Sequence, residues 1–95
     1  MMSDMVAVHV RIEGRVQRVW FRAWTVQEAT KRGLKGWVRN RSDGSVEAVF
    51  AGPEAQVTDM VQACWTGSPK SKVENVISEP ADLPSESDFR EIADA

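Results

Sequence analysis

The sequence predicts an α+β domain in which two helices cover one face of a β-sheet, and three observations lead to this prediction. Several segments alternate apolar and polar residues as half-buried strands do. Two segments between them carry helical signals, and Gly or Pro residues separate the segments. The chain has 95 residues, which is the length of one domain. We therefore expect a single domain over 1–95, with its core at about 5–80.

The first half of the chain begins with a strand at 5–13, where valine and isoleucine alternate with polar residues. Gly14 ends this strand, a loop follows at 15–20, and a helix is expected at 21–33, with Gly33 as its stop. The apolar stripe of this helix is thin. It consists of Val26, Ala29 and Thr30.

The second half contains the clearest helix of the chain, which begins at Gly52-Pro53 and ends before Gly67. Its residues at helical spacing form a stripe that we expect to be buried, namely Val57, Met60, Val61, Cys64 and Trp65. An Asp-Gly turn at 42–44 indicates a tight hairpin. Further strands are expected at 34–41, 45–51 and 72–79, followed by a short strand at 88–92 and a frayed end at 93–95.

This order of elements is typical of a ferredoxin-like βαββαβ sandwich, an antiparallel sheet with both helices on one face and here a short C-terminal fifth strand. The first and third strands are expected to be central and antiparallel. His9 would then lie on the open face of the sheet as a surface residue. Arg39 and Arg41 are expected to be surface charges on the face opposite Asn40. Trp37 and Phe50 are expected in the core.

Composition excludes several classes of protein. No apolar run approaches the roughly 18 residues of a membrane-spanning helix. The single cysteine, Cys64, cannot form an internal disulfide, and with His9 as the one histidine it cannot supply a zinc site. We therefore expect no metal. The first residues have neither the basic nor the apolar segment of a secretory signal, which predicts a cytoplasmic location.

Positive charge is concentrated in the first half of the chain. Residues 1–41 carry nine basic and three acidic residues, whereas residues 42–95 carry three basic and eleven acidic residues. The segment 14–22 lies between a strand and a helix N-terminus, where backbone N–H groups are unpaired and favour an anion. An arginine in the first helical turn can bind such an anion with two parallel hydrogen bonds. Many loops of this kind bind nothing, so the pattern alone leaves both possibilities open.

Two motifs in this chain resemble the acylphosphatase signature. The first motif is Gly14-Arg15-Val16-Gln17 followed by Val19 and Phe21-Arg22. The second motif is Gly36-Trp37-Val38-Arg39-Asn40 followed by Asp43-Gly44 and Val46-Glu47. Further residues fit the same pattern, namely Gly52-Pro53, Trp65, Gly67-Ser68-Pro69 and Val73. The resemblance covers about 6–80 of the chain.

The resemblance implies a hydrolase of acyl phosphates that works without metal or cofactor. It implies that Arg22 binds the phosphate oxygens and that Asn40 orients the attacking water. It also implies a phosphate-holding loop made of Gly14, Arg15, Val16, Gln17, Arg18, Val19 and Trp20. The expected partner is a small-molecule acyl phosphate, with no nucleic acid and no membrane, and the protein is expected to be a monomer.

Arg18 departs from the family pattern, which usually has glycine at this position. A positive φ would make arginine costly by about 1–2 kcal/mol. We expect activity to be retained, because backbone amides bind the phosphate. The alternative is a catalytically weak member of the family that binds phosphate or an acyl phosphate. An RNA-binding module is not favoured, because RNA binders of this fold need exposed aromatic residues on the two central strands.

Overall fold

The computed structural model describes residues 5–95, and its elements follow the expected order. Each element begins and ends within two residues of its expected bounds. The elements are β1 (Met5–Arg15), α1 (Phe21–Lys31), β2 (Lys35–Asn40), β3 (Val46–Pro53), α2 (Glu54–Thr66), β4 (Lys72–Pro80) and β5 (Phe89–Glu91).

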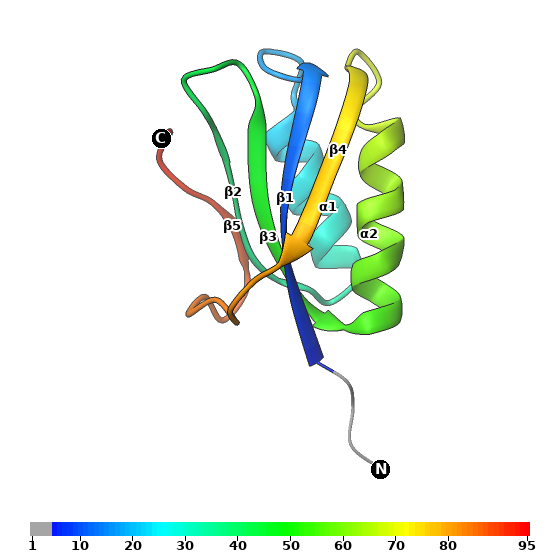
Figure 1. Ribbon diagram of the computed structural model, residues 1–95, viewed down its shortest axis with the longest axis vertical. Coiled ribbons are helices and arrows are strands. Elements are labelled where there is room, and N and C mark those ends of the chain that lie inside the picture. The colour runs from blue at the N-terminus through cyan, green and yellow to red at the C-terminus, as the bar shows by residue number, and fades with distance from the viewer. Residues whose placement is uncertain (1–4) are drawn as a thin grey trace.

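The strands form one sheet in the order β4-β1-β3-β2-β5, so β1 and β3 are central as expected. These two strands are antiparallel, with Val10 opposite Ala48. Figure 1 shows both helices on the same face of the sheet. The prediction of an antiparallel sheet was wrong at one edge, because β5 pairs with β2 in parallel. Residues 81–88 cross the end of the sheet where β4 stops, and β5 then runs back in the direction of β2.

The core lies between the sheet and the helices. Its largest fully buried apolar side chains include Phe21, Phe50, Ile12 and Met60. Burial of Cys64 in α2 raises the pKa of its thiol to about 12, so this cysteine is an unreactive packing residue at neutral pH. Within the described part of the chain, neither helix has the length and apolar character needed to cross a bilayer.

Three residues that were expected to be buried in the core are exposed or only half-buried. Thr30 is exposed, because α1 buries the face formed by Phe21, Thr25 and Ala29 instead. Trp65 is 47% exposed, because Cys64 is the residue of that turn which packs onto the sheet. Trp37 is half-buried on the open face of the sheet. Strand alternation explains its position, since the neighbouring Val38 points into the core.

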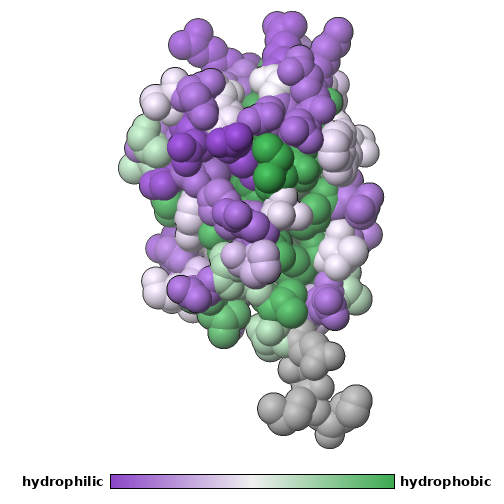
Figure 2. All heavy atoms as spheres, viewed as in Figure 1, coloured by the Kyte–Doolittle hydropathy of each residue, from purple (hydrophilic) through white to green (hydrophobic). Residues whose placement is uncertain are grey.

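The open face carries a cluster of charged residues around Glu47, which is only 3% exposed. The Glu47 carboxylate accepts a hydrogen bond of 2.7 Å from His9 and another from Arg39, and it pairs with Arg41 at 3.2 Å. Burial alone would raise the pKa of Glu47, but the hydrogen bonds from His9 and Arg39, together with the charges of Arg39 and Arg41, outweigh burial and lower the pKa. Figure 2 shows hydrophilic side chains covering the upper part of this face. His9 is thus a partner of a buried carboxylate rather than a free surface residue.

Candidate active site

The loop at 15–20 connects β1 to α1, and it is anchored by two buried valines. Val16 and Val19 are 1% and 6% exposed, whereas Arg18 and Trp20 point outward. Arg18 and Trp20 have φ values of 62° and 63°, in the left-handed region that favours glycine. Arg18 therefore adopts the backbone conformation expected of the glycine that it replaces in the pattern. In the part of the chain that the structure describes, no side-chain hydrogen bond caps the N-terminus of α1.

Two side chains far apart in the sequence hold this loop in place. The amide of Gln17 donates hydrogen bonds of 2.8 Å to the carbonyl oxygens of Arg41 and Ser45 in the β2–β3 hairpin. The hydroxyl of Ser68, which is 1% exposed, donates a hydrogen bond of 2.8 Å to the carbonyl oxygen of Val19. The side chain of Gln17 therefore has a structural role. The sequence offered no sign that Ser68 touches the loop.

Gly14 and Arg15 belong to β1, which continues two residues beyond its expected end. The pairing of β1 with β4 shifts register between Glu13 and Gly14. Gly14 has a φ of 122°, and a Cβ atom here would lie 2.2 Å from the carbonyl oxygen of Lys72. Glycine is therefore required at this position by the close approach of β4.

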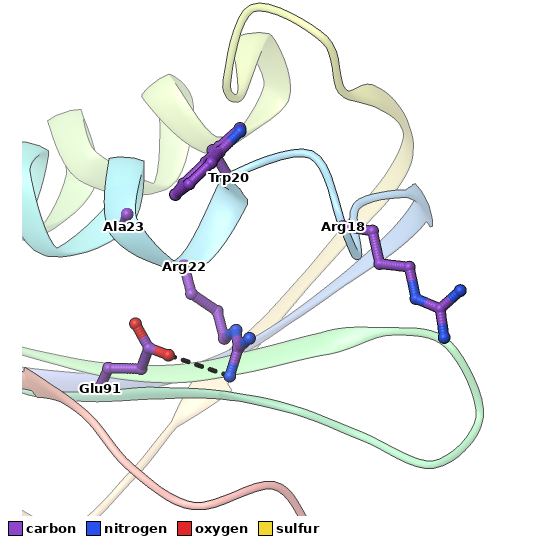
Figure 3. A pocket seen from close by; sticks show the side chains of 5 residues that line it. All are labelled: Arg18, Trp20, Arg22, Ala23 and Glu91. Carbon is purple, nitrogen blue, oxygen red and sulfur yellow. Dashed lines mark ion pairs between the residues drawn. The ribbon is translucent and has the colours of Figure 1, made fainter.

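Arg22 lies in the first turn of α1 and reaches toward the sheet, where it meets two carboxylates. Its Nη1 atom lies 3.0 Å from Oε2 of Glu91 and 3.1 Å from Oδ1 of Asp94. A hollow of about 340 Å³ lies beside it, lined by Arg18, Trp20, Arg22, Ala23 and Glu91. Figure 3 shows Arg22 reaching from the helix toward Glu91, while Arg18 extends from the loop on the other side and Trp20 points away.

Asn40 is the last residue of β2, and it lies on the face of the sheet that the helices cover. Its Oδ1 atom is buried and accepts no hydrogen bond from residues 5–95. A buried polar atom without a partner is uncommon and needs an explanation, such as a bound water or a catalytic role. Arg39 and Arg41 point to the opposite face, where both contact Glu47. The expectation that these two arginines lie opposite Asn40 is therefore confirmed.

The C-terminal segment brings Arg22 and Asn40 into one neighbourhood, because consecutive residues of this segment contact both of them. Asp94 contacts the Arg22 side chain, and the N–H group of Ala95 donates a hydrogen bond of 3.0 Å to the carbonyl oxygen of Asn40. The expectation of a frayed end at 93–95 was therefore wrong. Glu91 and Asp94 are contacts that the sequence analysis missed. The only available signal was their negative charge at a spacing of three residues.

No group of three or more His, Cys, Asp or Glu side chains within residues 5–95 is arranged to hold a metal ion. The site has a different character, because its charged groups are the guanidinium groups of Arg18 and Arg22, with one carboxylate, Glu91, on the wall. Such a hollow can receive an anion, since guanidinium groups bind phosphate and carboxylate oxygens in a fixed, planar geometry.

The fold places this chain in the class of small ferredoxin-like domains. The loop before its first helix contains two residues with positive φ. Comparison with known proteins narrows this class. The acylphosphatase family model matches residues 8–91, so the chain belongs to the acylphosphatase family.

Individual relatives agree with this assignment. An acylphosphatase of Rhizorhabdus wittichii is 55% identical over 73 residues, which cover 77% of this chain and 74% of the relative. An acylphosphatase of Rhodospirillum rubrum is 49% identical over 85 residues, which cover 90% and 93% of the two chains. The solved structure of an acylphosphatase from Coxiella burnetii has a TM-score of 0.90 at 35% identity and covers 94% of each chain.

Proposed function

We propose that this protein hydrolyses acyl phosphates, the mixed anhydrides of a carboxylic acid and phosphate, to a carboxylate and inorganic phosphate. The observation that carries the proposal is the hollow beside Arg22 at the start of α1. Arg18 and Trp20, two loop residues with left-handed backbone conformation, line the same hollow. Membership of the acylphosphatase family supports it. The substrate is a small molecule, and we propose a cytoplasmic monomer with no nucleic acid or membrane partner.

In this proposal the loop residues 14–20 and Arg22 hold the phosphate group. Backbone N–H groups of the loop and of the first turn of α1 donate to the phosphate oxygens, and the helix dipole adds partial positive charge. Arg22 supplies two parallel charged hydrogen bonds. Arg18 adds a second positive charge at the rim of the hollow. Phosphoryl transfer has a loose transition state with charge on the equatorial oxygens, so these donors stabilise the charge that develops.

Asn40 orients the attacking water in this proposal. Its buried Oδ1 is a hydrogen-bond acceptor without a protein partner among the described residues, which suits an acceptor for a water proton. The water oxygen forms a bond to phosphorus as the bond to the acyl oxygen breaks. The carboxylate leaves without a general acid, because its conjugate acid has a pKa of about 4. A phosphate oxygen takes the proton of the water, so no protein base is needed.

The alternative, a weakly catalytic member that only binds phosphate or an acyl phosphate, rests on Arg18. The backbone at Arg18 keeps the left-handed conformation of a glycine. The loop amides that would bind phosphate are therefore arranged independently of the side chain. This geometry supports an active enzyme over a binding-only protein.

The test is hydrolysis of an aromatic acyl phosphate in the presence of a chelator, with the parent protein and Asn40→Ala side by side. Asn75→Ala is the matched control, because Asn75 is an exposed asparagine on β4. We expect rapid turnover by the parent and the control, and a large loss of kcat in Asn40→Ala with similar binding of inorganic phosphate. A folded parent protein without turnover would contradict the proposed activity. Equal turnover by Asn40→Ala would contradict the role of Asn40.

A further inference from the structure

The arginine of the site is held by two carboxylates through a single nitrogen. Nη1 of Arg22 donates a hydrogen bond of 3.1 Å to Asp94 and forms an ion pair of 3.0 Å with Glu91. A guanidinium group has five N–H donors, of which Nη1 carries two. The two carboxylates therefore engage the donors of one corner of the group. The remaining donors belong to Nε and Nη2.

The edge of the guanidinium formed by Nε and Nη2 is the edge that can bind a phosphate side-on. Its two N–H bonds are parallel, as bidentate recognition of phosphate requires. Among residues 5–95, the hydrogen bond and the two ion pairs of the Arg22 side chain use Nη1 rather than this edge. The carboxylates thus orient the guanidinium from one corner and leave the bidentate edge available.

Backbone pairing fixes where these carboxylates lie. β5 pairs with β2, and the chain continues along β2 beyond the end of β5. The N–H group of Ile92 donates to the carbonyl oxygen of Val38, and the N–H group of Ala95 donates to that of Asn40, both at 3.0 Å. The segment is therefore aligned with the strand that ends in Asn40. Glu91 and Asp94 lie three residues apart on this aligned segment.

We infer that Glu91 and Asp94 are positioning residues, which orient Arg22 so that its Nε and Nη2 edge faces the phosphate. This inference rests on the proposed function, in which Arg22 binds the phosphate group. The carboxyl side chains are 43% and 59% exposed, so their ion pairs contribute little to stability. The ion pairs of Arg22 with Glu91 and Asp94 can still orient the guanidinium group, even if they add little to the stability of the fold.

A competing role for the two carboxylates predicts the opposite change in phosphate affinity when they are removed. Two carboxylates beside one arginine also repel a phosphate dianion, and a segment that blocks the site would have to release Arg22 before phosphate binds. Removing the charges would then tighten phosphate binding. If the carboxylates position Arg22, removing them weakens binding instead, because the guanidinium loses its fixed orientation. The direction of the change decides between the two roles.

The experiment compares the parent protein with the double variant Glu91→Gln, Asp94→Asn. The control is the double variant Glu86→Gln, Asp88→Asn, which makes the same change of charge in the preceding segment without touching Arg22. The measurements are the Kd for inorganic phosphate by calorimetry, and kcat and KM for an aromatic acyl phosphate. Conservative replacement by Asp94→Glu, which keeps a carboxylate, and thermal unfolding complete the set.

We expect the positioning variant to raise the Kd for phosphate by about 3- to 10-fold, up to about 1.4 kcal/mol, and to lower kcat/KM by a similar factor. Its melting temperature should match that of the control, and Asp94→Glu, which keeps both carboxylates, should bind phosphate more tightly than the double variant. An unchanged or tighter Kd would overturn the inference, provided that Arg22→Ala weakens phosphate binding. If Arg22→Ala leaves phosphate binding intact, the assignment of Arg22 to the phosphate site fails as well.

Discussion

The two faces of the sheet carry opposite arrangements of arginine and carboxylate. On the open face, one buried carboxylate, Glu47, contacts two arginines and a histidine. On the helix-covered face, one arginine, Arg22, contacts two exposed carboxylates. Three positive or polar side chains surround the buried charge of Glu47, and Nε of Arg41 has no hydrogen-bond partner among the described residues. At Arg22 both carboxylates contact Nη1, so the edge formed by Nε and Nη2 lies outside these pairs. A buried carboxylate surrounded by cationic partners belongs to the fold, whereas an arginine edge outside its ion pairs can bind an anion.

The same contrast appears within three consecutive residues. Arg39 and Arg41 contact Glu47 on the open face, while the intervening Asn40 points to the other face, where its Oδ1 has no hydrogen-bond partner among residues 5–95. Strand alternation separates these roles, because successive side chains point to opposite sides of a sheet. Substitutions at the end of β2 should therefore affect either stability or turnover, according to the face on which the side chain lies.

The largest expected effect is that of Arg22→Ala on turnover. Loss of one charge-stabilising donor costs about 2.7–4 kcal/mol in the transition state, so kcat/KM should fall by at least about a hundredfold. Arg90→Ala removes an exposed arginine paired with Asp88 and should leave kcat/KM nearly unchanged. Steady-state hydrolysis of an acyl phosphate measures both. Unaltered turnover by folded Arg22→Ala would contradict the assignment.

On the open face, Glu47→Ala should destabilise the fold by about 1–3 kcal/mol. The substitution leaves His9, Arg39 and Arg41 close together without the carboxylate that pairs with them. Denaturant unfolding measures the change, and turnover per folded molecule should stay within a few-fold of the parent. Glu13→Ala is the control, because its pair with Arg11 is exposed and contributes at most about 1 kcal/mol. Equal stability of the two variants would argue against the special role of the buried carboxylate.

Lowering the pH should weaken the interactions of Glu47 with His9, Arg39 and Arg41. The pKa of Glu47 lies below its ordinary value of 4.5 in the folded protein, so the unfolded state binds the proton more readily. The resulting stabilisation is present above pH 4.5 and is lost as pH falls through the lowered pKa. The free energy of unfolding, measured from pH 7 to pH 3, should decline less steeply for Glu47→Gln than for the parent. Parallel curves would show that other carboxyl groups account for the loss.

The smallest expected effect is that of Arg18→Gly, which should stabilise the protein by about 0.5–1 kcal/mol. Relief of the left-handed conformation gains about 1–2 kcal/mol, and the greater freedom of glycine in the unfolded chain offsets about 0.4–1 kcal/mol of it. Turnover should change by no more than a few-fold. Arg18→Ala removes the charge and keeps the unfavourable φ of 62°. If Arg18→Ala stabilises the protein as much as Arg18→Gly, charge rather than backbone conformation is the cause.

Sequence reasoning succeeded where a residue's environment follows from local periodicity. The order of the elements, with which the alternation of β1 agrees, predicted a central antiparallel pairing of β1 with β3, and that prediction is confirmed. The exposure of Trp65 was missed, because it depends on how α2 packs against the sheet. The position of Trp37 was missed although alternation places it on the face opposite Val38. The contacts of Arg22 were missed because Asp94 lies 72 residues away in the sequence. The roles of Arg22, Asn40 and the loop residues stay predictions until the variants are measured.

The three hydrogen bonds that anchor the loop at 15–20 join it to segments far away in the sequence, which has a consequence for folding. Gln17 is bonded to residues 24 and 28 positions away, and Ser68 reaches back 49 positions to Val19. We therefore expect the loop to acquire its conformation only after the β2–β3 hairpin and the turn after α2 have docked on β1. A phosphate bound at this loop would recognise the complete domain and no smaller part of it. Ligand binding should then raise the free energy of global unfolding and slow amide exchange throughout the sheet.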